Sequence, residues 1–352
     1  MLSIGENIKL SIYGSSHGRE IGFILENIEE GHRLDLDELQ AFIDRRAPGR
    51  NALSTPRKES DILFISEGLE DGKTRGRIRG YFLNENTKSK DYSTFKRYPR
   101  PSHIDYVAQE KYGEDIDLAG SGFFSGRLTA PIVAAGGIVN QILAKKGINI
   151  YSHYKRIGSI EDRDFDFINL NDGAGLDKAF PLVDEKLKKS MVDEILAAKE
   201  DRDSLGGIIQ VGIKGIEAGL GGPYFERFQS KLGSYIFSIP GVKGLEFGNG
   251  FGAASMRGSE NNDDFIMVDG RVRTRTNNSG GLNGGISNGM PIIYNIAVKP
   301  TSSIYRQQET VDLKEGKQAK IRIDGRHDPA FIVRTPAVFE AISGLCLYDL
   351  LR

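Results

Sequence analysis

Alternating apolar and polar positions predict most of the strands in this chain. Segment 8–14, IKLSIYG, alternates and ends at a glycine, and a second apolar run follows at 21–28. Because successive side chains of a strand point to opposite faces, such alternation is typical of a half-buried sheet. Segment 61–83 predicts two strands around a glycine turn. Further strands are predicted at 148–158, 206–216 and 292–304, with a strand and a glycine-rich loop at 241–260.

Apolar residues at helical spacing predict a second set of elements. Segment 34–47 carries acidic residues early, as the first turn of a helix prefers. Segment 127–147 is largely apolar, so we expect a helix that is buried on several sides. Segment 336–351 starts with Pro336, a residue suited to the first helical position. Helices are also predicted at 186–203 and 230–240.

The chain shows no composition break or linker, so we expect one domain over residues 1–352. The order of strands and helices in the first half partly recurs in the second, which indicates two similar layers within that domain. The 43 glycines are far above the usual share of about 7 %. They gather in loops such as 119–126 and 276–291, where close backbone approach or positive φ is expected.

Charge and cysteine content exclude several classes of protein. With 47 basic and 48 acidic residues, the net charge of -1 argues against a general nucleic-acid binder, though not against a local basic pocket. The single cysteine, Cys346, excludes an intramolecular disulfide and a Cys-based zinc site, and we expect it to be a buried apolar residue. The N-terminus does not resemble a signal peptide, and no apolar run approaches the ~20 residues that span a bilayer. We therefore expect a cytoplasmic protein that binds neither nucleic acid nor membrane.

Standard nucleotide and metal motifs are missing from the sequence, including GxGxxG after the first strand, GxxxxGK[ST] and HExxH, and GxSxG appears nowhere as a strand-to-helix elbow. No metal site is predicted. The five histidines are His17, His32, His103, His153 and His327. His32 and His153 have ordinary neighbours and are expected to be structural or exposed. His17 lies among small residues, His103 among prolines, and His327 beside an arginine and an aspartate, so these three are candidates for proton transfer.

Arginines gather in the predicted loops, at Arg45, Arg46, Arg50, Arg57, Arg97, Arg100, Arg127, Arg326 and Arg334. Surface charge alone would account for some of them, Arg97 in particular. Guanidinium groups on glycine- and proline-rich loops are also suited to forked binding of carboxylate and phosphate. If the loops converge, we expect a cationic pocket for a small, multiply anionic substrate. The glycine loops and KPTSS, residues 299–303, could supply donors to a phosphate-bearing cofactor.

The residues laid out above resemble the chorismate synthase family along nearly the whole chain. The shared blocks, in order, are GSSHG (14–18), RRAPGR (45–50), STPRKESD (54–61), NENTKSKDYS (84–93), RPSHIDY (100–106), KYGEDI (111–116), DSLGG (203–207), SIPGVKGLEFGNGF (238–251), GSENND (258–263), TNNSGGLNGGISNGMPI (276–292), KPTSSI (299–304) and GRHDP (325–329). A dozen ordered blocks with sensible spacing are highly specific, whereas one KPTSS would not be.

The chain departs from the family pattern at Ser15, Ala47, Ser102 and Ala330, where Glu, Arg, Gly and Cys are usual. The largest departure is segment 120–129, GSGFFSGRLT, which helps to hold flavin and substrate in the family. There Phe123, Phe124 and Leu128 replace polar residues. We expect at least one of the two phenylalanines to pack into the core rather than to touch a flavin.

The resemblance implies the last step of the shikimate pathway. In that step 5-enolpyruvylshikimate 3-phosphate loses phosphate and a C6 proton by an anti 1,4-elimination and becomes chorismate. The two carboxylates and the phosphate of this substrate agree with the arginine-rich loops. The pattern and the resemblance together predict an α+β fold, a single-domain layered β-α-β sandwich whose long glycine-rich loops form the active site.

The resemblance also implies roles for individual residues. His17 matches the histidine placed to protonate the leaving phosphate, and His103 the one near the flavin ring, where it would favour an anionic reduced flavin. Asp328 matches the aspartate that assists proton removal, and Ser16 and Ser125 match hydroxyls that relay protons. The implied substrate contacts are Arg46, Arg127 and Arg334, and the implied cofactor contacts are Ser125, Asn283, Gly284, Lys299, Pro300, Thr301, Ser302, Ser303 and Arg326. The remaining candidate, His327, is expected to orient its loop.

The implied cofactor is reduced FMN, needed without net redox change. Because no added domain could host a flavin reductase, we expect an external reductase or reductant, with NADPH acting only indirectly. Arg46 has a family counterpart linked to NADPH, but Ala52 stands where a second such arginine is typical. The family implies a homotetramer. Two other functions stay open here: a flavin-dependent redox enzyme of another pathway, and a non-catalytic anion-binding protein.

Overall fold

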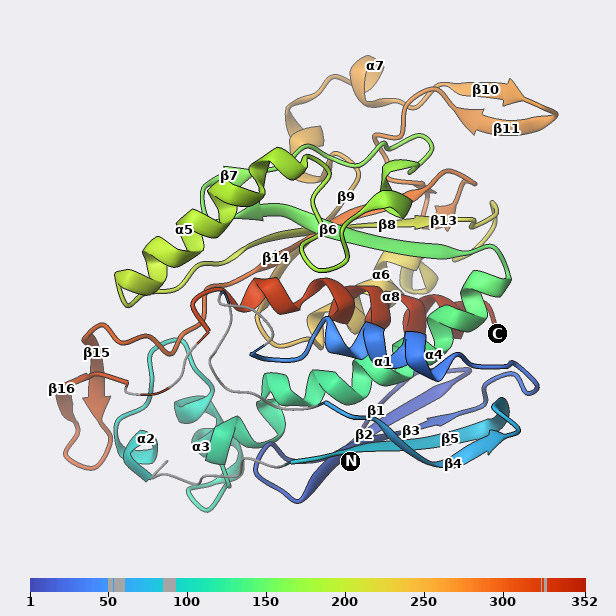
Figure 1. The fold of residues 1–352 in the computed structure, drawn as a ribbon. Coiled ribbons are helices and arrows are strands. Elements are labelled where there is room, and N and C mark those ends of the chain that lie inside the picture. Colours follow the sequence, from blue (N-terminus) through green and yellow to red (C-terminus); the bar gives the residue numbers. More distant parts are fainter. Residues whose placement is uncertain (50–52, 54–60, 85–92, 324, 326–327) are drawn as a thin grey trace.

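Two antiparallel sheets enclose a layer of helices (Figure 1). The computed structural model describes residues 1–352 except 50–52, 54–60, 85–92, 324 and 326–327. The first sheet has the order β1-β2-β3-β5-β4 and consists of β1 (Leu2–Ile4), β2 (Lys9–Gly14), β3 (Glu20–Glu26), β5 (Lys73–Leu83) and β4 (Phe64–Glu70). The second has the order β7-β6-β8-β14-β9 and consists of β7 (Ile160–Glu161), β6 (Asn149–Ile157), β8 (Gly207–Lys214), β14 (Ile292–Val298) and β9 (Val242–Phe247).

Alternation along the strands directs apolar side chains of both sheets into the helical layer. In β3 the buried residues at every second position are Ile21, Phe23 and Leu25, and β8 repeats the pattern with other aliphatic residues. These side chains belong to one hydrophobic cluster that also includes the central helices. The two sheets therefore share a core, as the predicted β-α-β layering requires.

The helical layer contains α1 (Leu36–Asp44), α4 (Thr129–Lys145), α6 (Phe228–Phe237) and α8 (Pro336–Leu350). Every residue of α8 except Leu350 is buried, so this helix lies at the centre of the molecule. A side chain at Gly136 of α4 would place its Cβ 2.5 Å from the Cβ of Ala341. Glycine is needed there because α4 and α8 approach each other so closely.

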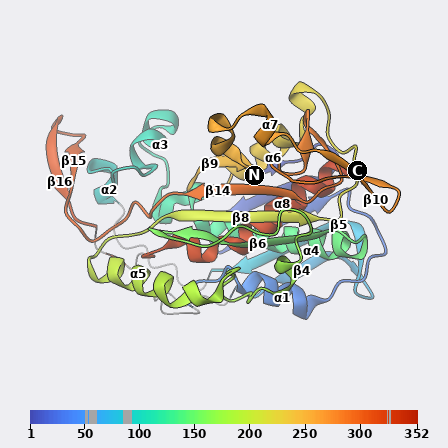
Figure 2. The ribbon, with the colours of Figure 1, turned by 90° about the horizontal axis from the view of Figure 1, so that it is seen from above.

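Smaller elements lie outside the sandwich. Figures 1 and 2 show α2 and α3 beside the β15–β16 hairpin at one end of the molecule. The outer elements are α2 (Ser93–Arg97), α3 (Asp105–Tyr112), α5 (Lys188–Glu200), α7 (Gly258–Asn261), β10 (Phe265–Val268), β11 (Arg271–Thr274), β12 (Leu282–Asn283), β13 (Ile286–Ser287), β15 (Gln308–Asp312) and β16 (Lys317–Ile321).

The long predicted elements are confirmed, with ends that differ by a few residues. The helix predicted at 34–47 runs from Leu36 to Asp44, and the one predicted at 230–240 ends at Phe237, before Pro240. The sequence pattern predicts no helix or strand in the polar segment 84–105, but this segment contains α2 and the first residue of α3. The glycine loop at 276–291 likewise contains the short strands β12 and β13.

Within the described residues, one helical stretch is long and apolar enough to pass for a membrane span, which the sequence was not expected to contain. It covers Ala119–Lys145 and includes α4, and 78 % of its most apolar window is buried inside the fold. A buried core helix meets the same criteria, so the finding is weak evidence for a membrane segment. The core position expected for 127–147 is confirmed.

Candidate active site

Segment 119–126 joins many of the predicted site residues. It consists of two short 3-10 turns before α4, and φ is positive at three successive residues, 120–122. The Ser16 hydroxyl lies 3.2 Å from the carbonyl oxygen of Ala119 and 3.0 Å from that of Gly120. A Cβ at Gly120 would lie 2.1 Å from Cε1 of His17. The loop therefore fits against Ser16 and His17 only because residue 120 has no side chain.

His17 lies at the end of β2 with its Nδ1 3.2 Å from the hydroxyl of Ser16. Because that hydroxyl donates to a backbone carbonyl, Nδ1 acts as the donor and carries the hydrogen. The contact with Ser16 thus orients the imidazole through Nδ1. This arrangement can support an acid at Nε2.

His103 contacts the same segment. Its Nδ1 donates to Oδ1 of the buried Asp105 at 2.9 Å, and its Nε2 is 3.3 Å from the hydroxyl of Ser121. Burial lowers the pKa of His103, and the carboxylate of Asp105 offsets that effect only in part because Arg100 and Lys299 add positive charge. The imidazole is therefore neutral near pH 7, with the lone pair of Nε2 directed toward Ser121.

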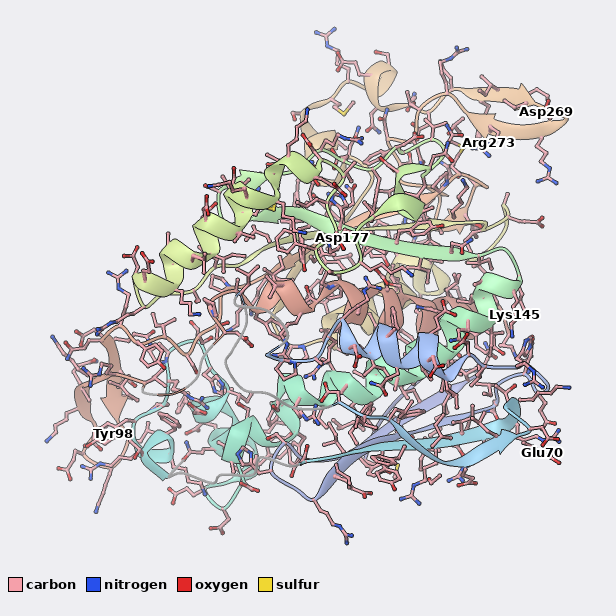
Figure 3. All side chains as sticks on the ribbon, viewed as in Figure 1. Glu70, Tyr98, Lys145, Asp177, Asp269 and Arg273 are labelled. Atoms are coloured by element: carbon pink, nitrogen blue, oxygen red, sulfur yellow. The ribbon has the colours of Figure 1, made fainter. Side chains whose placement is uncertain are left out.

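Asp105 is a positioning residue that sequence reasoning missed. It accepts from Nε of Arg100 at 2.7 Å and from Nη2 of the same side chain at 2.6 Å. Burial opposes its ionisation, but the bonds from Arg100 and His103 outweigh burial and lower its pKa. Its place two residues after His103 was an available local signal. Nearby, Tyr98, labelled in Figure 3, donates to Asp312 and helps fix this segment against the β15–β16 hairpin.

A cavity of about 820 Å³ opens beside His103 and segment 119–126. Its polar lining includes His103, Ser121, Asp328 and residues 299–302. Its apolar lining includes Leu2, Ile104, Tyr112, Phe123, Phe124, Phe237 and Phe331. The cavity thus combines hydroxyl and ammonium groups with aromatic walls.

The KPTSS segment contributes the polar part of this cavity. Lys299 Nζ donates to the carbonyl oxygen of Ser102 and to the hydroxyl of Ser302, each at 2.7 Å. Burial and the neighbouring Lys243 lower the pKa of Lys299. Thr301 Oγ1 is buried without a hydrogen-bond partner among the described residues, whereas the hydroxyl of Ser303 accepts from Arg100 at 3.3 Å. Pro300 also lines the cavity.

The three predicted substrate arginines lie close together next to segment 119–126. Asp61, which is fully buried, accepts from Nη1 of Arg46 at 2.7 Å and from Nη1 of Arg127. Arg334 donates from Nε to the carbonyl oxygen of Arg46 at 3.0 Å and from Nη1 to Asp328 at 2.9 Å. Three guanidiniums and two carboxylates therefore form one cluster with an excess of positive charge.

The arginines of this cluster differ in how accessible they are to a ligand, and Arg46 is the most deeply buried of the three. Arg46 also donates to the hydroxyl of Thr129 and to the carbonyl oxygen of Gly126, and it is 3 % exposed. Burial and the charge of Arg334 lower the pKa of Arg46 to about 9, so it remains a cation near pH 7. In this structure Arg46 is directed at protein groups rather than at open space, which differs from the expected direct substrate contact.

Ser125 and Asn84 contact Arg127, and Asn84 also contacts the segment around His17. The hydroxyl of Ser125 accepts from the backbone N–H of Arg127 at 3.3 Å. The side chain of Asn84 accepts from Nε of Arg127 and donates to the carbonyl oxygens of Ser15 and Gly18. Asn84 was not singled out in the sequence, although it stands in a shared block.

Not every predicted cofactor contact reaches the cavity. Asn283 and Gly284 lie in and after β12, near the beginning of β14, whereas Lys299 directly follows its end. A seven-residue strand separates them, which is roughly 20 Å. Asn283 and Gly284 therefore do not join the other predicted contacts within one chain. Arg326 and His327 lie outside the described residues.

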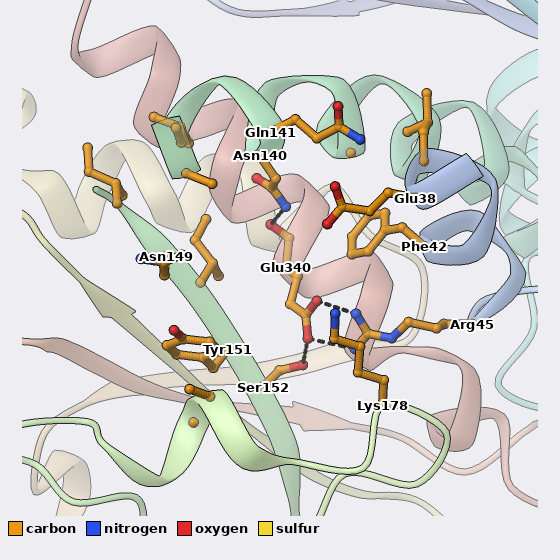
Figure 4. Close-up of a pocket in the computed structure, with 18 of the residues that line it drawn as sticks. Glu38, Phe42, Arg45, Asn140, Gln141, Asn149, Tyr151, Ser152, Lys178 and Glu340 are labelled. Atoms are coloured by element: carbon orange, nitrogen blue, oxygen red, sulfur yellow. Dashed lines mark hydrogen bonds and ion pairs between the residues drawn. The ribbon is translucent and has the colours of Figure 1, made fainter. Parts of the chain in front are cut away.

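A second cavity, of about 570 Å³, lies between α1, α4 and β6 (Figure 4). At its base Arg45 and Glu340 form a two-pronged ion pair of 2.6 and 2.7 Å, and Ser152 donates to the same carboxylate. Consecutive arginines thus serve different regions, because Arg45 faces this cavity and Arg46 faces Asp61. None of the predicted site residues lines it. Among the described residues, no group of three or more His, Cys, Asp or Glu could hold a metal ion.

Comparisons with known proteins agree over the whole chain. Residues 8–351 match the family model described as chorismate synthase. The chain is 42 % identical over 346 residues to a chorismate synthase of Pyrococcus abyssi, covering 98 % of this chain and 96 % of that protein. It is 41 % identical over 351 residues to one of Methanobrevibacter smithii, covering 99 % and 95 %. A solved crystal structure of chorismate synthase superimposes with a TM-score of 0.78 at 25 % identity, covering 99 % of this chain and 92 % of that one.

Proposed function

Because the chain belongs to the chorismate synthase family, we propose that the cavity beside segment 119–126 and the adjoining arginine cluster are its active site. The function of the chain is that of chorismate synthase, a carbon–oxygen lyase of the shikimate pathway that acts on a phosphate-bearing substrate. The family generally uses reduced flavin. The observation that carries the proposal is the meeting of separate blocks at one segment: His17, His103 and Arg46 all contact residues 120–126.

The cavity fits reduced FMN as the cofactor. Aromatic walls suit a planar ring, and the ammonium of Lys299 and the hydroxyls of Thr301 and Ser302 suit a phosphate. The unpartnered hydroxyl of Thr301 is the kind of group that a ligand would satisfy. When bound, reduced flavin would supply electron density and a basic ring nitrogen. An external reductase or reductant would provide the reduced form, with NADPH only as its indirect source.

The arginine cluster fits 5-enolpyruvylshikimate 3-phosphate, which carries two carboxylates and a phosphate. Arg127 and Arg334 would bind these anions, while Arg46 would act as a positioning residue that holds Asp61 and the carbonyl of Gly126. The role of Asp61 is to fix Arg46 and Arg127 in place. Two carboxylates leave the three guanidiniums with net positive charge, and that excess favours a polyanion.

Proton transfer would fall to the two histidines. Nε2 of His17 would donate a proton to the departing phosphate, since Nδ1 is already committed to Ser16. Asp105 would hold His103 with its Nε2 lone pair toward the cavity, ready to take up a proton when an anion binds nearby. Asp328 would be oriented by Arg334 at the cavity wall, where it could assist removal of the C6 proton.

The flavin contacts expected from Asn283 and Gly284 would come from a neighbouring protomer of a homotetramer, because these residues lie roughly 20 Å from Lys299 in their own chain. The whole assignment is tested by mixing anaerobic protein, chemically reduced FMN and the enolpyruvyl phosphate, with chorismate absorbance and phosphate release followed together. We expect both products in equal amounts. We expect none aerobically with oxidised FMN alone, and chorismate formed without any reductant would refute the need for reduced flavin.

A further inference from the structure

We propose that Tyr112 and Phe123 form an aromatic platform that holds the flavin ring of the cofactor. This inference rests on the proposed function, because it takes the cavity beside segment 119–126 to be the flavin site. Neither Tyr112 nor Phe123 is among the predicted site residues. Phe123 and Phe124 stand where the family pattern has polar residues, so a contact through the ring would be a property of this chain.

Several exposed apolar side chains line this cavity together. Met1, Leu2, Tyr112, Phe123 and Phe237 are each between 46 % and 78 % exposed, and all of them line it. A concentration of exposed apolar groups marks a binding site rather than ordinary surface. The flavin ring is the occupant we choose, because it is planar and largely apolar and because the family uses it.

The aromatic residues are fixed in place before any ligand binds. Phe123 meets Tyr112 edge-on with ring centres 6.5 Å apart, and Phe124 lies 5.5 Å from Phe123 and 6.1 Å from Tyr112. Phe124 packs against a small buried cluster that contains Ala108, Ile116 and Leu118. It therefore anchors Phe123, which stays exposed in the cavity. The expectation that at least one phenylalanine packs inward holds for Phe124 in part, since it is half-buried.

The polar groups of the same cavity define where the rest of the cofactor would lie. Lys299 uses two of its three N–H donors on Ser102 and Ser302, which leaves one for a ligand. The lining thus offers one ammonium to a phosphate and several aromatic faces and edges to a ring. A platform of this kind binds any flavin with an intact ring, whether or not it carries a phosphate.

The test compares FMN and riboflavin, both oxidised, titrated into the full-length protein and followed by flavin fluorescence anisotropy. We expect Phe123→Ala to weaken both ligands by about the same factor, roughly 5- to 10-fold, as for the loss of one stacking contact. The flavin affinity of Phe123→Leu should lie between those of the wild type and Phe123→Ala. Lys299→Ala should weaken FMN and leave riboflavin unchanged. Phe251→Ala is the matched control, because Phe251 is also exposed but lies outside the cavity lining.

Three outcomes would overturn the platform. One is unchanged affinity of Phe123→Ala for both flavins, and another is a loss that affects FMN alone. The third is a change in the oligomeric state of Phe123→Ala by light scattering with unchanged flavin affinity, which would mark the apolar wall as a contact between protomers. Each of these can occur while the wild-type protein still converts the enolpyruvyl phosphate to chorismate with reduced FMN. Failure of the platform is therefore distinguishable from failure of the proposed active site.

Discussion

Replacement of Asp61 by asparagine is expected to damage both the stability and the substrate affinity of the protein. Asp61 is fully buried and bonded to Arg46 and Arg127. Asparagine keeps the shape of the side chain but removes the negative charge that pairs with both guanidiniums. Removal of one partner from a buried ion pair costs about 3–5 kcal/mol, because the other partner stays buried without compensation. We expect the free energy of unfolding to fall by about that amount.

The same change should loosen Arg127, whose orientation depends on Asp61. Loss of one well-placed charged hydrogen bond to the substrate corresponds to about 1.5–3 kcal/mol, so KM should rise roughly 10- to 100-fold. Phosphate should stabilise Asp61→Asn more than it stabilises the wild type, since an anion can replace the lost carboxylate that links Arg46 and Arg127. Urea unfolding with and without phosphate, together with steady-state kinetics, measures both effects.

The pH dependence gives an independent check on the charge of Asp61. Burial opposes ionisation, but Arg46 and Arg127 outweigh it and hold the pKa of Asp61 below the usual 3.8. A carboxyl group with a lowered pKa in the folded state stabilises the protein above its unfolded pKa, and that stabilisation is lost as the pH falls through the folded value. The difference in stability between wild type and Asp61→Asn should therefore be full near pH 7 and should shrink below about pH 4.

The control is Glu161→Gln, because Glu161 also pairs with two cations but is 44 % exposed. An exposed pair of this kind contributes at most about 1 kcal/mol. If Asp61→Asn fails to fold, Asp61→Glu keeps the charge and should fold with a smaller rise in KM. An Asp61→Asn protein with the urea midpoint and KM of the wild type would refute the reasoning.

Three further predictions concern the histidines and the loop between them. His17→Ala and His103→Ala should each lower turnover by roughly 10- to 1,000-fold with the fold retained, and full turnover in both variants would contradict their roles. NMR titration should find the pKa of His103 below 6.5 without ligand and higher with bound reduced FMN, because an anion favours the imidazolium; a downward shift would count against the assignment. Gly120→Ala should cost about 1–3 kcal/mol and displace His17, because its Cβ would lie 2.1 Å from the ring; a thermal midpoint equal to the wild type would exclude that contact.

Helices and strands whose buried residues recur at regular spacing could be predicted from the sequence. Elements without such regular spacing were missed. Helix α8 and strand β3 were predictable because nearly every residue or every second residue faces the core. Helix α3 was not, since Tyr106 and Val107 are exposed and only Asp105 and Ala108 of its eight residues are buried. Its first residue is Asp105, a charged residue that is buried beside Arg100 and His103.

The sequence indicated which arginines belong to the site. It did not indicate which carboxylates pair with them. Arginines in glycine-rich loops stand out in a sequence, whereas Asp61 is one of 48 acidic residues with no local mark of burial. Which carboxylate meets Arg46 and Arg127 is decided by the fold. The same holds for Arg45, which neighbours Arg46 in the chain but pairs with Glu340 nearly three hundred residues away. Composition indicates a cationic pocket, and the three-dimensional contacts determine which arginines remain available to a ligand.

Strand β14 separates two sequence blocks to which the resemblance assigns the same role, and comparison of the blocks alone does not show this separation. The resemblance implies flavin contacts both in the glycine block before β14 and in the KPTSS block after it. Helix α6 gives an independent measure of their separation, because Gly285 accepts from Phe228 at its first residue, whereas Phe237 at its last residue lines the cavity. Ten helical residues span about 15 Å, in accord with the length of β14. Two rigid elements thus keep Asn283 and Gly284 away from the cavity of their own chain. If the proposed cavity holds the flavin, contacts from Asn283 and Gly284 would therefore come from a second copy of the protein, because α6 and β14 are packed in the shared core and hold these residues away from the cavity of their own chain.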